Sequence, residues 1–172
     1  MTDDILKYPV GKFTPPASYT QEEMAAWIND IKTLPGKVRN AVIGLTEPQL
    51  NTPYRPGGWT IKQVVHHLAD SHMNSLIRFK WAMTEENPTI KTYKEGEWAM
   101  LRDYQLPVES SLKMLEGIHQ HLVALFESMT DEEWSRTFYH PEMKIDVSLK
   151  RNLGLYSWHS RHHLAHTTNT KF

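Results

Sequence analysis

Apolar residues recur at every third or fourth position in four long stretches of the chain. These stretches cover residues 24–45, 61–83, 112–129 and 149–163. A repeat of this period places apolar side chains along one face of a helix, so each stretch predicts an amphipathic helix. The segments between them carry no internal repeats and no domain linkers. We therefore expect an all-α protein with one domain over residues 1–172, a four-helix bundle with long connections and short extra helices.

Capping and turn residues mark where the helices begin. In a capping box, a threonine and the Glu or Gln three residues later bond each other's backbone amides. The pattern occurs at Thr20 with Glu23, Thr60 with Gln63 and Thr130 with Glu133, and Ser148 precedes the last stretch. Pro35 and Gly36 predict a kink or a break in the first helix, because proline removes a helical hydrogen bond. Gly154 costs the last helix about 1 kcal/mol relative to alanine, which predicts close packing against a neighbouring helix there.

Two connections are long enough to hold structure of their own. Residues 89–105 mix polar and apolar positions around Tyr93 and Trp98, and we interpret them as an ordered connection between the second and third helices. Residues 139–147 predict a loop with a short hairpin around Pro141. Both connections add to the bundle without changing its class.

Composition narrows the class of protein. The chain has 172 residues, 40% of them hydrophobic, and a formal net charge of −1, which predicts a folded core and no electrostatic attraction to nucleic acid or membrane. The absence of cysteine excludes disulfides, thiolate ligands and a cysteine nucleophile. No apolar run approaches the roughly 18 residues of a membrane span, and the N-terminus lacks a secretory pattern. We therefore expect a cytoplasmic protein.

Histidines are concentrated near the C-terminus. Four of the ten lie in residues 159–166, where they form two pairs spaced four apart, His159 with His163 and His162 with His166. Residues four apart lie on the same face of a helix, and two imidazoles so placed can bind one divalent metal ion. A third ligand is needed, and residues 66–72 supply candidates in His66, His67 and His72.

Helical angles constrain these choices without completing them. At about 100° per residue, His72 lies in the middle of the apolar stripe of the second helix, with His66 and His67 on opposite flanks. Periodicity alone therefore nominates His72 as the inward histidine. On the last helix it prefers His159 and His163 to the other pair, because they lie nearer the apolar stripe. The third ligand stays open at this point.

Four segments of the sequence carry a family resemblance. Residues 57–72, 73–79, 138–141 and 153–166 resemble the DinB-like superfamily, most closely the YfiT-type metal-dependent hydrolases, which are also described as bacillithiol transferases. The family's His-Leu-Ala-Asp pattern falls on His67, and its C-terminal His-x-x-x-His falls on His159 and His163. The resemblance thus implies a three-histidine metal site in a DinB-like four-helix bundle, usually a homodimer.

Other polar and aromatic groups have two interpretations each. His72 is expected as a core histidine that could also support a ligand, and His119, His121, His162 and His166 as polar or interface groups. Asp70 either orients a ligand imidazole or is a surface carboxylate. Arg78 and Arg161 either meet an anionic thiol or substrate or form solvated salt bridges. Trp59 is expected to pack, as is Trp158.

The last helix also predicts assembly. Leu155 and Trp158 lie opposite Leu149 and Leu153, so the helix is apolar on two sides. Such a helix must be covered on both sides. We therefore expect a two-fold homodimer, in agreement with the resemblance.

Chemistry follows from the ligand set. Three neutral imidazoles leave a divalent ion its full charge and an open position, as in catalytic sites. Imidazole suits zinc, nickel, iron or copper, and we expect one zinc or nickel ion per chain, with manganese and iron as alternatives. Bound water or a bound thiol ionises near neutral pH at such an ion.

Three functions are compatible with this site. The first is S-transfer from a low-molecular-weight thiol such as bacillithiol to a small electrophilic substrate, the second is metal-dependent hydrolysis, and the third is a metal- or ligand-binding bundle without turnover. The sequence shows no catalytic residue beyond the metal site and no general base. That absence favours a nucleophile that ionises on the metal.

Overall fold

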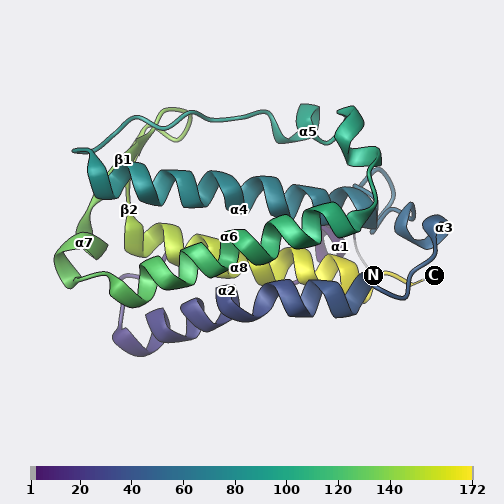
Figure 1. The fold of residues 1–172 in the computed structure, drawn as a ribbon, viewed down its shortest axis with the longest axis horizontal. Helices are drawn as coiled ribbons and strands as arrows, with labels where there is room; N and C mark the ends of the chain where they lie inside the picture. Colours follow the sequence, from purple (N-terminus) through teal and green to yellow (C-terminus); the bar gives the residue numbers. More distant parts are fainter. Residues whose placement is uncertain (1–2, 172) are drawn as a thin grey trace.

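The computed structural model describes residues 3–171 and confirms the four-helix bundle (Figure 1). The long helices are α2 (Gln21–Val42), α4 (Ile61–Thr84), α6 (Val108–Ser128) and α8 (Leu149–Asn169). Helix α2 packs against α8 and α6, and α4 packs against the same two helices. The first two long helices, α2 and α4, therefore lie diagonally opposite each other in the bundle, and α8 is a direct neighbour of α4.

Two clusters of buried apolar side chains fill the bundle. One cluster includes Ile31, Phe79, Leu122 and Leu153, contributed by all four long helices. The other lies around Leu34, Val65, Leu68 and Leu115 and draws on α2, α4 and α6. The predicted apolar stripes thus all face inward, and burial of these side chains provides the main driving force for the arrangement.

The capping residues act as the sequence predicts. Thr20, Thr60 and Thr130 each accept a hydrogen bond from the amide three residues later and complete a capping box, and Ser148 caps α8. A further box, Thr46 with Gln49, begins the short helix α3 (Glu47–Leu50), which periodicity did not reveal because four residues show no period. Caps of this kind contribute about 1 kcal/mol each.

Expectations for two helix interiors had different outcomes. Of the predicted kink or break at Pro35, the break does not occur, because α2 continues through Pro35 and Gly36 to Val42. The predicted close approach at Gly154 is confirmed, since a Cβ there would lie 3.1 Å from the Trp27 ring of α2. Glycine at this position lets α8 pack directly on the indole.

Short elements occupy the connections. The ordered segment before α6 contains α5 (Glu95–Trp98) and the 3₁₀ helix η1 (Arg102–Gln105). Helix α7 (Asp131–Ser135) follows α6, as predicted from its capping box. The predicted hairpin is also confirmed: β1 (Thr137–His140) pairs antiparallel with β2 (Ile145–Ser148). This hairpin lies beside the C-terminal end of α4 (Figure 1).

The N-terminal segment covers the second apolar side of α8. After the short helix α1 (Asp3–Lys7), the Gly11 carbonyl accepts a hydrogen bond of 2.9 Å from Trp158 Nε1, and Phe13 packs against the Trp158 ring. Leu155 and Trp158 also line a cavity. The N-terminal segment thus covers part of Trp158 within one chain, which weakens the argument for a dimer from this apolar side, while Leu155 and Trp158 both stay partly exposed.

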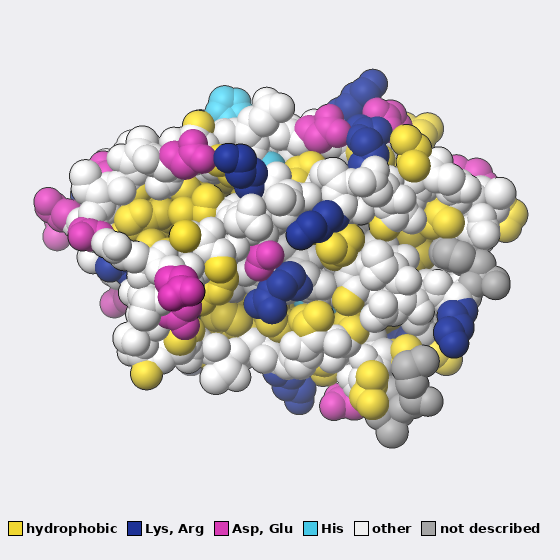
Figure 2. Space-filling view, turned by 90° about the horizontal axis from the view of Figure 1, so that it is seen from below, with side chains coloured by type: hydrophobic (Ala, Val, Ile, Leu, Met, Phe, Trp, Pro, Cys, Tyr) yellow, Lys and Arg dark blue, Asp and Glu magenta, His cyan; other side chains and the backbone are white. Residues whose placement is uncertain are grey.

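The surface carries mixed charge. On the face on the side of α2, shown in Figure 2, basic and acidic side chains are interspersed among apolar ones, and neither sign covers the face. This agrees with the net charge of −1. In residues 3–171 no helix is both long and apolar enough to cross a membrane.

Candidate metal centre

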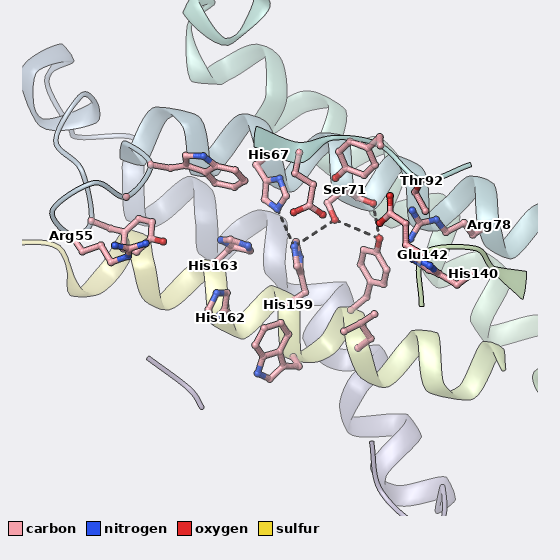
Figure 3. A pocket seen from close by; sticks show the side chains of 18 of the residues that line it. Arg55, His67, Ser71, Arg78, Thr92, His140, Glu142, His159, His162 and His163 are labelled. Atoms are coloured by element: carbon pink, nitrogen blue, oxygen red, sulfur yellow. Dashed lines mark hydrogen bonds between the residues drawn. The ribbon is translucent and has the colours of Figure 1, made fainter. Parts of the chain in front are cut away.

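The three predicted ligands meet between α4 and α8. His67 extends from α4 toward His159 and His163, which lie one turn apart on α8 (Figure 3). One ring nitrogen from each lies within 4.8 Å of the other two, and the Nε2 atoms of His67 and His159 are 3.1 Å apart. The diagonal order of the helices produces this convergence, because it makes α4 and α8 neighbours.

The separation of one pair of these nitrogens fits a shared ion. Two imidazole nitrogens bound to zinc at about 2.0–2.1 Å lie roughly 2.9 Å apart at a right angle and roughly 3.4 Å apart at the tetrahedral angle. The observed 3.1 Å between His67 and His159 falls within this range. The donor set and the separation therefore both suit one divalent ion.

Desolvation keeps the three imidazoles neutral, as metal ligands must be. Desolvation, followed by the neighbouring histidines, lowers the pKa of His67 to about 3. Desolvation likewise holds the pKa of His159 and of His163 well below the usual value, with the facing histidines adding to the effect. At neutral pH each ring therefore has one bare nitrogen that can bind a metal.

The structure separates the candidates for the third ligand. His66 points away from the site. Its ring nitrogens instead lie 2.7 Å from Ser111 Oγ and 3.1 Å from the Leu106 carbonyl oxygen. His72, which periodicity favours, is fully buried and contacts the back of His159, with His72 Nε2 3.3 Å from His159 Nδ1. The family register rather than the helical wheel therefore identifies the histidine that joins the C-terminal pair.

A second group of imidazoles lies behind the first. His162, His163 and His166 also bring ring nitrogens within 4.8 Å of one another, and His163 Nδ1 lies 3.3 Å from His166 Nδ1. His166 stacks on Tyr54, with ring centroids 3.8 Å apart. The His163 ring has one nitrogen for each side. With its Nδ1 beside His166, its Nε2 is left to face the triad, so we interpret His166 as a group that orients His163.

Burial distinguishes the remaining histidines. His119, His162 and His166 are buried within the chain, whereas His121 on the same helix as His119 is exposed. Three of the four histidines expected as polar or interface groups are therefore covered by this chain itself, whereas His121 is open to solvent.

The triad faces a cavity of about 500 Å³. Its lining comes from α4, α8, the turn before α4, the segment around α5 and the β-hairpin, with Trp59 packed against the His67 ring at one end. Figure 3 shows His67, His159 and His163 in the middle of the view and Arg78, His140 and Glu142 together on one side of them. The cavity thus joins a candidate metal site to a charged subsite.

The structure places the two predicted arginines differently. Arg78 lines the cavity, is 9% exposed, and its Nε is buried without a hydrogen-bond partner among the described residues. Arg161 points elsewhere and forms an ion pair of 3.3 Å with Asp30. The Asp70 carboxylate accepts a hydrogen bond of 2.7 Å from Tyr104, and no hydrogen bond between it and a ligand histidine occurs among residues 3–171. Of the two predicted arginines, Arg78 is therefore the one placed to meet a ligand in the cavity.

Sequence reasoning missed several polar groups of the cavity. Tyr93 and Glu95 come from the long connection, and His140 and Glu142 come from the hairpin. Burial raises the pKa of Glu95, while Arg78 acts in the opposite direction. Elements of four residues or fewer are too short to show a periodicity that would indicate which side chains face inward. The resemblance in residues 138–141 is the one sequence signal that pointed to this region.

Comparison with known proteins identifies the family. The DinB superfamily model matches residues 18–167. A Bacillus cereus protein, provisionally named a metal-dependent hydrolase, is 51% identical over 166 residues, covering 96% of this chain and 95% of its own. An Oceanobacillus iheyensis protein with a similar provisional name is 50% identical over 163 residues, covering 95% and 94%.

Two solved structures share the fold. YfiT from Bacillus subtilis, described as a probable metal-dependent hydrolase with an unusual four-helix bundle topology, matches with a TM-score of 0.93 and 47% identity over 96% of this chain and 95% of its own. A mycothiol-dependent maleylpyruvate isomerase matches with a TM-score of 0.61 and 14% identity, over 81% and 60%, which shows a shared fold alone. By sequence and by structure, the chain belongs to the DinB superfamily.

Proposed function

We propose that the chain is a metal-dependent enzyme that binds one divalent ion through His67, His159 and His163 and transfers a low-molecular-weight thiol, of the bacillithiol type, to an electrophilic small molecule. A divalent ion held by three neutral imidazoles supplies an open coordination position at which a thiol or a water ionises near neutral pH. The observation that carries the proposal is the convergence of the three ring nitrogens at the wall of a cavity.

The groups that hydrogen-bond to the triad favour a thiol over water. Glu95 and Glu142 line the same cavity, Glu142 on the side of Arg78 (Figure 3), and no hydrogen bond among the described residues joins a carboxylate to a triad histidine. The nearest hydroxyl to the triad is Ser71 Oγ, 3.5 Å from His159 Nε2, and a serine is a poor general base. A thiol ionises more readily than water and needs no such base, so the residues present suffice for it.

The charged subsite suits a ligand with anionic character. Arg78 is buried and has an unsatisfied Nε donor, and a ligand carboxylate would provide the missing acceptor with a charge-assisted hydrogen bond. Glu95 and Glu142 lie nearby and would receive a cationic group of the same ligand. The chain's part in the reaction is therefore to bind the thiol compound at this subsite and to orient its sulfur toward the triad.

Hydrolysis is the second candidate, favoured by the provisional names of the relatives. The experiment that separates the two uses zinc- or nickel-loaded protein, an electrophile such as a bimane, and bacillithiol either present or omitted. Saturable, metal-dependent consumption that requires the thiol supports transfer. Ester turnover that scales with metal and ignores the thiol would establish a hydrolase, and no turnover with either would leave a binding bundle.

A further inference from the structure

Pro35 leaves an acceptor free in the middle of α2. In a helix the carbonyl of residue i accepts from the amide of residue i+4. For Ile31 that amide belongs to position 35, where proline has no N–H. The buried Ile31 carbonyl instead accepts a hydrogen bond from His119 Nδ1 of α6. The proline thus makes a backbone acceptor available to a side chain of the neighbouring helix.

This contact fixes the orientation of His119. A carbonyl oxygen can only accept, so the His119 proton lies on Nδ1. Desolvation lowers the pKa of His119 to about 4, so its ring is neutral near pH 7 and has one N–H. His119 Nε2 is then bare and must act as the acceptor in its 2.9 Å contact with His72 Nδ1.

The same reasoning carries the direction on to the triad. His72, also fully buried, donates through Nδ1 to His119, which leaves its Nε2 bare. That atom lies 3.3 Å from His159 Nδ1, which must therefore donate. His159 then has its proton on Nδ1 and its lone pair on Nε2, the atom that lies 3.1 Å from His67 Nε2.

We propose that the Ile31 carbonyl, His119 and His72 form a relay of hydrogen bonds that holds His159 in the tautomer with a bare Nε2, ready for a metal ion. His72 and His119 are thus positioning residues. Many metal-bound histidines are oriented by a carboxylate or a carbonyl in direct contact. Here two further imidazoles connect the ligand to a carbonyl on α2, so the metal site depends on residues of all four long helices.

The tautomers can be tested without any variant and without metal. In metal-free protein labelled with ¹⁵N at histidine, long-range ¹H–¹⁵N correlation near pH 7.5 should show the Nδ1–H tautomer for His119, His72 and His159. A proton on Nε2 of His72 or His159 would overturn the relay. The tautomers test the relay separately from the proposed metal site on which it rests. If wild-type protein fails to bind zinc, the metal site is wrong, but the measured tautomers still decide for or against the relay.

Variants at the far end of the relay test its effect on metal binding. His119→Leu removes the acceptor of His72, and zinc affinity by chelator competition should fall about 10- to 100-fold, as for other groups that support a ligand. His119→Gln places an amide oxygen near the former Nε2 and should keep affinity close to wild type. His121→Leu, an exposed change on the same helix, is the matched control and should alter nothing.

Two outcomes of the variant series contradict the relay. The first is a folded His119→Leu protein, judged by circular dichroism, that binds zinc as wild type does. The second is a His119→Gln protein that binds as weakly as the Leu variant, which would show that ring packing rather than the acceptor matters. If His119→Leu does not fold, the Gln variant and the tautomers of the wild-type protein decide.

Discussion

Acidification should unfold the metal-free protein, because its buried histidines resist protonation. Desolvation lowers the pKa of each of the following residues below the usual value: His66, His67, His72, His119, His159, His162, His163 and His166. Below about pH 6.5 the unfolded chain takes up protons that the folded chain does not. The stability that these groups contribute is therefore fully present above about pH 6.5 and is lost as pH falls toward their folded pKa values.

The size of the effect follows from two well-buried rings. The pKa is lowered to about 3 for His67 and to about 4 for His119. At pH 5 the unfolded state gains about 2 kcal/mol from each, or about 4 kcal/mol for the pair. The other buried histidines add in the same direction. Since domains of this kind have a free energy of unfolding of about 5–15 kcal/mol, we expect large destabilisation by pH 5.

Urea unfolding followed by tryptophan fluorescence, with chelator present, measures this loss at pH 7.5, 6.5, 5.5 and 5. The free energy of unfolding should be nearly constant above pH 7 and fall steeply below 6.5. His119→Gln should lose about 2 kcal/mol less than wild type over this interval, whereas His121→Gln should follow wild type. A free energy that stays flat down to pH 5 would refute the assignment of neutral, buried imidazoles.

Three further predictions follow from individual contacts. Gly154→Ala should lower stability by about 1 kcal/mol in thermal unfolding, since crowding against Trp27 outweighs the gain in helix propensity; a higher Tm would contradict this. Arg78→Gln should raise the KM for the thiol with little change in kcat, while Arg161→Gln, which breaks only the surface pair with Asp30, should leave KM unchanged; equal effects of the two would argue against the subsite. Light scattering should give twice the chain mass of 20.1 kDa if the predicted homodimer forms, and a constant mass of one chain would exclude it.

The bundle was predictable because it depends on local patterns. Period and capping residues located the long helices, and Gly154 predicted the close approach of a neighbouring helix, which the structure shows to be at Trp27 of α2. Pro35 misled, because a proline at this position breaks one hydrogen bond without ending the helix when tertiary packing holds both halves. The consequence of that missing bond lies on another helix, and the sequence around Pro35 cannot show it.

The site was predictable only in part, for a related reason. The family register placed His67 with His159 and His163, whereas helical angles favoured His72. His67 and His72 are both buried, so the helical angle relative to the apolar stripe could not distinguish the metal ligand from the histidine that orients another ligand. The charged subsite includes Glu95 from a four-residue helix and Glu142 from a hairpin turn, which are too short to show a period, and it depends on tertiary contacts that no local pattern records.

Metal content is the most direct test of the central proposal, that His67, His159 and His163 bind one divalent ion per chain. We would measure metal by mass spectrometry on wild type and on three single alanine variants, with circular dichroism to confirm folding and His162→Ala as the neighbouring control. We predict about one ion per chain in wild type and in His162→Ala, and loss from each of the three ligand variants. Normal metal content in folded His163→Ala, or loss confined to His162→Ala, would contradict the site.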